Sequence, residues 1–218
     1  MKKITIVADL VYFRPRIWRR FEISDQNNLQ ELMDLIMILF KMTSLHLYNL
    51  EIPVAQNEFA RNNRDENGKL TKRMPRFPFQ RAETVEPDRS ISKLDYGVFS
   101  PGFFDDESNK SSHIYDKIKA LDKIESLNLY KGDKMFFYYD YGDDWQIKLV
   151  VEKVEDDNNT ENMLVPKLLK GKGYGIIEDV GGVYGLGREF YDNPNLKNLY
   201  KEELIDDIEY YFSDNLDQ

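Results

Sequence analysis

Cysteine is absent from the sequence, and the only two histidines are His46 and His113. The lack of cysteine excludes disulfide bonds, thiol catalysis and thiolate metal sites, and it fits a protein of a reducing compartment. No apolar run reaches the roughly 20 residues that a membrane-spanning helix requires. Asp9 and Arg14 interrupt the apolar residues near the N-terminus before a secretory signal could form. We therefore expect a cytoplasmic protein with no membrane partner.

Basic residues are in the minority, since 30 Lys and Arg face 39 Asp and Glu and leave a net charge of −9. This balance opposes nonspecific binding to nucleic acid, which depends on Lys and Arg neutralising phosphates. Residues 14–20 are a local exception, with four arginines around Trp18. Alternation there favours a strand with Ile17, Arg19 and Phe21 on one face and solvated arginine heads. Contact with nucleic acid through these arginines and Trp18 remains an alternative.

The remaining composition predicts one folded domain over residues 1–218, because 41% of the residues are hydrophobic and 13% aromatic. Apolar alternation predicts strands at 3–10, 17–23 and 45–52. Asn28 and Glu31 form a capping pattern that opens a helix over 28–41, which is apolar on most of its surface. The stretch 54–111 lacks sustained periodicity, and we interpret it as an inserted, loop-rich segment.

The second half of the chain adds a hairpin, in which strands 134–141 and 145–154 flank a turn at Gly142–Asp144. Further elements expected are a helix near 112–127, a strand at 164–169, a glycine-rich passage over 171–187 and a helix at 198–212. These elements predict an α+β fold in which a mixed β-sheet packs on the central helix in a β-grasp-like arrangement, with the inserted loop-rich segment and a C-terminal helix.

Two acidic segments, Tyr138–Trp145 and Ile177–Gly182, are the candidate site. Both combine carboxylates with glycines that permit close backbone approach, so we expect them to lie together. We expect Asp143, Asp144 and Asp179 to hold the junction by accepting bonds from backbone N–H groups, with a ligand bound beside it. The predicted ligand-binding residues are Trp18, His46, Tyr141, Asp143, Asp144, Trp145, Glu178 and Asp179.

Several segments together resemble the plasmid pRiA4b ORF-3-like family. They are Ile17–Arg20, Leu29–Leu32, Ser44–His46, Tyr139–Trp145 and Glu178–Gly182, in the family's order. The resemblance spans nearly the whole chain except 54–111, and it implies a compact α+β fold. The family includes passenger proteins of insertion elements, some labelled resolvase-like, and no biochemical activity is established for it. The chain carries no nucleophile arrangement of a serine or tyrosine recombinase.

The chain also departs from the family pattern. Gln146 and Ile147 stand where family members often carry Glu-His, and Met33 replaces a histidine near the start of the helix. Ile176 and Ile177 replace two prolines, and the nearby cysteines are missing. Because the imidazoles are lost, these departures weigh against catalysis.

Three functional hypotheses follow. We favour a noncatalytic binding or accessory module for a protein or small-molecule ligand, associated with a plasmid or mobile element. The first alternative is a divalent-metal-dependent enzyme using Asp140, Asp143, Asp144, Glu178 and Asp179, with His46, to bind Mg²⁺ or Mn²⁺. The second is the nucleic-acid-binding accessory protein.

A purely structural interpretation of the same residues makes Asp143 and Asp144 turn residues and His46 a strand histidine. We expect no cofactor, because no Gly-Lys-Ser/Thr follows Gly171–Gly175 and no dinucleotide fingerprint opens a helix.

Overall fold

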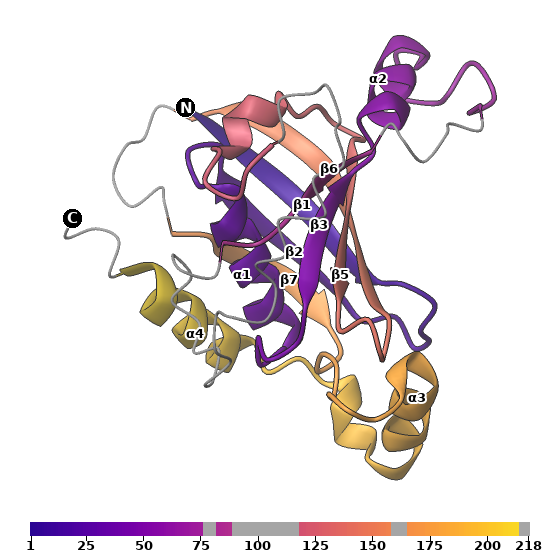
Figure 1. Cartoon of the computed structure of the whole chain (residues 1–218), viewed down its shortest axis with the longest axis vertical. Coiled ribbons are helices and arrows are strands. Elements are labelled where there is room, and N and C mark those ends of the chain that lie inside the picture. Colours follow the sequence, from indigo (N-terminus) through magenta and orange to yellow (C-terminus); the bar gives the residue numbers. More distant parts are fainter. Residues whose placement is uncertain (76–81, 89–117, 158–164, 214–218) are drawn as a thin grey trace, which may run out of the picture.

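The computed structural model describes residues 1–75, 82–88, 118–157 and 165–213. Seven strands form one sheet in the order β4-β3-β5-β6-β1-β2-β7, and helices pack around it (Figure 1). The strands are β1 (Lys2–Leu10), β2 (Trp18–Ser24), β3 (Tyr48–Ile52), β4 (Glu83–Val85), β5 (Lys134–Tyr139), β6 (Trp145–Asp156) and β7 (Lys167–Lys172). The helices are α1 (Leu29–Phe40), α2 (Val54–Asn62), α3 (Gly182–Asp192) and α4 (Lys201–Ser213), with short 3-10 helices η3 (Ile124–Leu127) and η4 (Pro194–Lys197).

The expected α+β class is confirmed, but the expectation of a mixed sheet is wrong. Every strand pairing in the described ranges is antiparallel. Tight connections reverse the chain between β1 and β2 and between β5 and β6. The helix α1 connects β2 to β3, which lies four places away from β2 in the sheet order. This crossover therefore does not put two parallel strands side by side. The likeness to a β-grasp arrangement stays a prediction.

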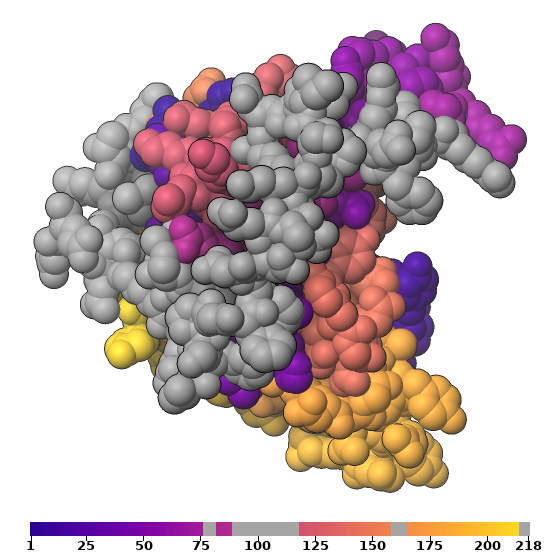
Figure 2. Space-filling model, in the orientation of Figure 1, coloured from indigo at the N-terminus to yellow at the C-terminus, as the bar shows by residue number. Residues whose placement is uncertain are grey.

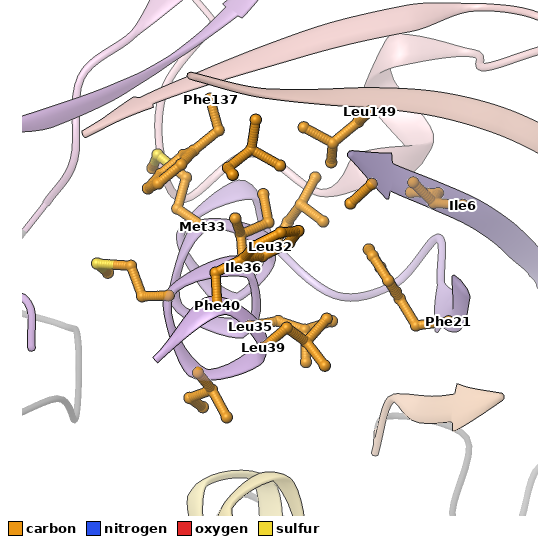
Figure 3. Packing of buried hydrophobic residues seen from close by; sticks show 14 of the residues in the cluster. Ile6, Phe21, Leu32, Met33, Leu35, Ile36, Leu39, Phe40, Phe137 and Leu149 are labelled. Carbon is orange, nitrogen blue, oxygen red and sulfur yellow. The ribbon is translucent and has the colours of Figure 1, made fainter. Parts of the chain in front are cut away.

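The helix α1 begins at the predicted capping box. The Asn28 side chain accepts a bond from the Glu31 N–H at 2.8 Å, and the Glu31 carboxylate accepts one from the Asn28 N–H at 2.8 Å. All residues of α1 except Glu31 are buried. Figure 3 shows apolar side chains of α1 beside residues from four strands, namely Ile6, Phe21, Phe137 and Leu149. This helix and the sheet therefore share one apolar core.

The predicted helix near 112–127 is not found over its described part. Residues 112–117 lie outside the described residues, and 118–127 contain turns, a β-bridge from Lys123 to Asn28, and η3. Backbone N–H groups of this segment bond to the loop before α1. Ile124 N–H donates to Asn27 O at 2.9 Å, and Glu125 N–H donates to Asp25 O at 2.8 Å. Pairing with the loop before α1 thus replaces the intrahelical bonds that a helix would make.

Two further expectations change near the candidate site. The strand predicted at 45–52 begins only at Tyr48, which leaves His46 in the preceding connection instead of in a strand. The glycine-rich passage contains α3, which sequence reasoning missed. Leu186 and Phe190 of α3 are buried, and Phe190 packs edge-on against Phe13 with ring centroids 5.0 Å apart. Tertiary packing therefore outweighs the low helix propensity of glycine.

The strand expected at 164–169 is found as β7 at Lys167–Lys172, whereas α2 and β4 were not expected as elements. The β5–β6 hairpin and the C-terminal helix α4 are present. The 54–111 stretch contributes α2 and the edge strand β4, while 76–81 and 89–111 lie outside the described residues. On the face drawn in Figure 2, α2 stands at one end and α3 at the other. No helix in the described ranges is long and apolar enough to cross a membrane.

Candidate functional site

The β5–β6 turn and the loop before α3 lie against each other, as expected for the two acidic segments. The Gly181 N–H donates to Asp143 Oδ2 at 3.3 Å. Gly182 approaches so closely that a Cβ atom on it would lie 2.4 Å from the backbone oxygen of Asp143. Figure 1 shows α3 at the end of the molecule where the β5–β6 turn lies. The predicted junction is confirmed.

Asp140 shapes the turn from its first position. Its side chain accepts bonds from the Gly142 N–H at 3.0 Å and the Asp143 N–H at 3.4 Å, and its backbone oxygen accepts from the Asp144 N–H at 2.7 Å. Its φ of 53° is a left-handed conformation that Asp tolerates better than most residues. The turn carboxylate is therefore Asp140, which is 8% exposed.

Glu178 fixes the second loop to the rest of the site. Its Oε1 accepts from the Thr43 N–H at 2.7 Å and from the Tyr139 hydroxyl at 2.5 Å, and its Oε2 accepts from the Thr43 hydroxyl. Burial, and next the bond to Glu178, hold the pKa of Tyr139 well above its usual value, so the hydroxyl stays a donor. Sequence reasoning missed these anchor roles of Thr43 and Tyr139. The role of Tyr139 could have been inferred from the sequence. The alternation of β5 places its side chain inward, and a buried tyrosine hydroxyl needs a hydrogen-bond partner.

One imidazole lies among three carboxylates. His46 Nδ1 is 3.5 Å from Asp140 Oδ2, and Nε2 is 3.8 Å from Asp179 Oδ1 and 3.9 Å from Glu178 Oε2. The ring packs edge-on against Tyr139 at 5.6 Å. One ligand atom from each of His46, Asp140 and Asp179 lies within 4.8 Å of the others. We refer to His46, Asp140, Glu178 and Asp179 as the His46 cluster.

The roles expected of the aspartates change. Asp143 accepts from a backbone N–H across the junction as predicted, but Asp144 accepts from the Gln146 side chain at 3.0 Å instead. Asp179, with its side chain 81% exposed, faces His46. Glu178 does the anchoring that was expected of Asp144 and Asp179, because Thr43 and Tyr139 supply donors on its side of the loop.

The predicted aromatic residues are not gathered at the cluster. Trp145 is fully buried in the apolar core, so it is not available to a ligand at the surface. Tyr141 is 57% exposed and its hydroxyl accepts from Asn49 at 2.8 Å. Trp18 pairs with Asp9 and Lys172 in the sheet, and the Arg16 guanidinium lies 4.8 Å from its ring centre.

The arginine segment does not present a basic face, and the expectation of solvated heads is wrong for Arg19. This residue is 0% exposed and donates to the carbonyls of Leu39, Trp18, Lys172 and Tyr174. Arg16 pairs with Asp9 and Arg20 with Glu152. Arg14 donates to the Phe13 carbonyl at 3.0 Å, so all four arginines bond within the protein, which argues against phosphate binding through this segment.

Substituting Gly182 by alanine tests the close approach at the junction. Gly182 has φ of 64°, and an added Cβ would meet the Asp143 oxygen, so we expect unfolding free energy to fall by about 1–3 kcal/mol. Gly187→Ala is the matched control, because nothing lies within 4 Å of its Cβ position; it should leave stability unchanged or raise it. Urea denaturation measures both, and equal midpoints would contradict the tight junction.

Comparison with known proteins places the chain in a family. The sequence model described as "Plasmid pRiA4b ORF-3-like protein" matches residues 2–211, and the chain belongs to this family. No curated protein matches it. The crystal structure of MM3350, a protein of unknown function from Methanosarcina mazei Go1, is similar with a TM-score of 0.56. That similarity covers 94% of this chain and 88% of that chain at 16% identity, and it concerns the fold alone.

Three of the departures, Met33, Ile147 and Ile176, lie in the core, whereas Gln146 and Ile177 are partly exposed. Met33 and Ile147, which stand where family members often carry histidine, are both 0% exposed and belong to the apolar core cluster. Ile176 is 1% exposed and packs in the same cluster. The replacements at these three positions are therefore compatible with burial, and within the described residues the junction keeps the imidazole of His46.

Proposed function

We propose that this chain is a noncatalytic binding module whose ligand carries a positive charge and binds at the His46 cluster. The observation that carries the proposal is the approach of three carboxylates to one imidazole. Within the described residues, the cluster combines three carboxylates with one imidazole, so it has more acidic than basic groups. Such a site favours a cationic ligand.

The hydrogen bonds that Glu178 and Asp140 already accept within the protein favour binding over catalysis. Glu178 accepts bonds from one backbone and two side-chain donors, and Asp140 accepts two backbone bonds. A general acid or base must exchange a proton with a substrate within hydrogen-bond reach. Carboxylates committed to holding loops are poorly placed for that role, whereas Asp179 is accessible.

Three wider features belong to the same proposal. The site rests on α1 as the central helix of a β-grasp-like arrangement, because Thr43, which bonds to Glu178, lies three residues after the last residue of that helix. The protein acts in the cytoplasm, as the absence of cysteine suggests. Its association with a plasmid or mobile element rests on the family description alone.

A thermal-shift panel in the presence of a chelator tests the proposal. Argininamide, agmatine and spermidine are the cationic probes, and inorganic phosphate is the anionic comparison. We expect at least one cationic probe to raise the unfolding temperature, since a ligand at 100 times its Kd stabilises by about 2.7 kcal/mol. Asp179→Asn should abolish the shift and Asp144→Asn should retain it. A panel in which no cation acts, or in which both variants behave alike, would contradict the proposal.

The second candidate is the divalent-metal-dependent enzyme. The observation that favours it is the Asp179 carboxylate, 81% exposed and 3.8 Å from His46 Nε2, where it can reach a substrate. A Mn²⁺-dependent hydrolysis assay with bis(p-nitrophenyl) phosphate distinguishes the two. Turnover that disappears in Asp179→Asn but persists in Asp144→Asn would favour the enzyme.

A further inference from the structure

We infer that the His46 cluster is a binding site for a divalent transition-metal ion, with zinc preferred, held by His46, Asp140 and Asp179. The inference rests on the proposed function and adds a metal ion to the cations that the site binds. Each residue offers one ligand atom, and these atoms lie within 4.8 Å of one another. The proposed ligands are thus one imidazole nitrogen and two carboxylate oxygens.

The separations within the cluster fit coordination better than hydrogen bonding. The shortest separations are 3.5 Å from His46 Nδ1 to Asp140 Oδ2 and 3.8 Å from His46 Nε2 to Asp179 Oδ1, and one of these two nitrogens would bind the ion. These separations exceed those of ordinary N–H···O bonds. Ligand atoms around tetrahedral zinc lie roughly 3.4 Å apart, given bonds of about 2.1 Å. The longest separation, 4.8 Å, must shorten, and Asp179 can move because its side chain is 81% exposed.

The surroundings hold the proposed ligands in place. Tyr139 packs against the His46 ring, and the Asp140 side chain is fixed by two backbone donors of the turn. Glu178, 3.9 Å from His46 Nε2, is fixed by Thr43 and Tyr139 and adds a further carboxylate beside the ion. Hydrogen-bonded neighbours of this kind orient metal ligands and strengthen binding.

The donor chemistry selects the ion. An imidazole nitrogen suits zinc and other first-row transition metals, whereas Mg²⁺ and Ca²⁺ prefer all-oxygen sites. The site should therefore bind Zn²⁺ more tightly than Mn²⁺, following the usual affinity order, and discriminate against Mg²⁺. The ion would also join the β5–β6 turn to the loop before α3, because Asp140 and Asp179 come from these two segments.

Calorimetric titration of the full chain with Zn²⁺, Mn²⁺ and Mg²⁺ tests the inference. We expect one zinc per chain and weaker Mn²⁺ binding. Asp179→Asn and His46→Asn should each lower zinc affinity by roughly tenfold or more. Asp144→Asn is the matched control, because Asp144 is also exposed and left-handed in φ but contacts Gln146 instead of the cluster. Asn tolerates this conformation, so circular dichroism should find all aspartate variants folded.

The outcomes separate this inference from the proposed function. If Zn²⁺ does not bind, or if Asp144→Asn weakens it as much as Asp179→Asn, the metal site is refuted. If the cationic organic probes still stabilise wild type and not Asp179→Asn in that case, the proposed function stands without the metal. If His46→Asn leaves zinc affinity unchanged while Asp179→Asn lowers it, nitrogen ligation is wrong and the inference fails.

Discussion

Replacing Arg19 by alanine is expected to lower the free energy of unfolding by roughly 3–5 kcal/mol. The guanidinium is fully buried and donates to four backbone carbonyls, which belong to β2, the end of α1, the end of β7 and the segment after β7. Burial lowers the pKa of Arg19 to about 9, which leaves it charged at neutral pH. Alanine would leave a cavity and buried carbonyls without donors. Urea denaturation of wild type and variant measures the loss.

Arg20→Ala is the matched control for this effect. Arg20 neighbours Arg19 in the sequence, but its side chain is 40% exposed and pairs with Glu152. A partly exposed pair of this kind contributes about 0–1 kcal/mol. Arg19→Lys should give an intermediate loss, because an ammonium cannot match the planar donor geometry of guanidinium. Similar losses for Arg19→Ala and Arg20→Ala would show that the carbonyl contacts are not stabilising.

Replacing Ile36 by alanine is expected to cost about 2–5 kcal/mol of unfolding free energy. Ile36 is 0% exposed in α1, and Figure 3 shows its side chain within the shared core. Removing its branched end loses buried apolar area and leaves a cavity, since the surrounding core relaxes only in part. The unfolding midpoint in urea should therefore fall with an unchanged denaturant dependence.

Leu121→Ala is the comparison for Ile36→Ala. Leu121 is 58% exposed, so its truncation should change stability by less than about 0.5 kcal/mol. A near-neutral midpoint for Ile36→Ala would show that α1 is peripheral to the stability of the fold, and the proposal of a central helix would then be withdrawn.

Much of the fold was predictable because its signals are local. Alternation of apolar residues identified β1, β2, β5 and β6 to within a few residues, and the Asn28 capping box located the start of α1. The helix α3 was not predictable in this way. Its glycines disfavour a helix, and its stabilising contacts, such as that of Phe190 with Phe13, exist only in the folded chain.

The candidate site was predicted in outline, but the roles of its residues were not. The spacing of acids and glycines indicated that the two loops meet, and Asp143 crosses the junction as expected. A carboxylate can anchor a loop only if hydrogen-bond donors lie near it. Glu178 accepts bonds from Thr43 and Tyr139, whereas Asp179 faces His46 and solvent.

The sequence by itself determined the α+β class, most strand positions, the capped helix and the pair of acidic segments. These follow from composition and from residue spacing along a few turns or strand repeats. Only the tertiary structure decided the strand order, the burial of Arg19 and the composition of the His46 cluster. The acceptors of Arg19 outside its own strand lie 20 to 155 residues away in the sequence. His46 meets Asp140 and Asp179 because three separate connections lie at one end of the sheet. Local sequence patterns cannot predict contacts between residues so far apart in the chain.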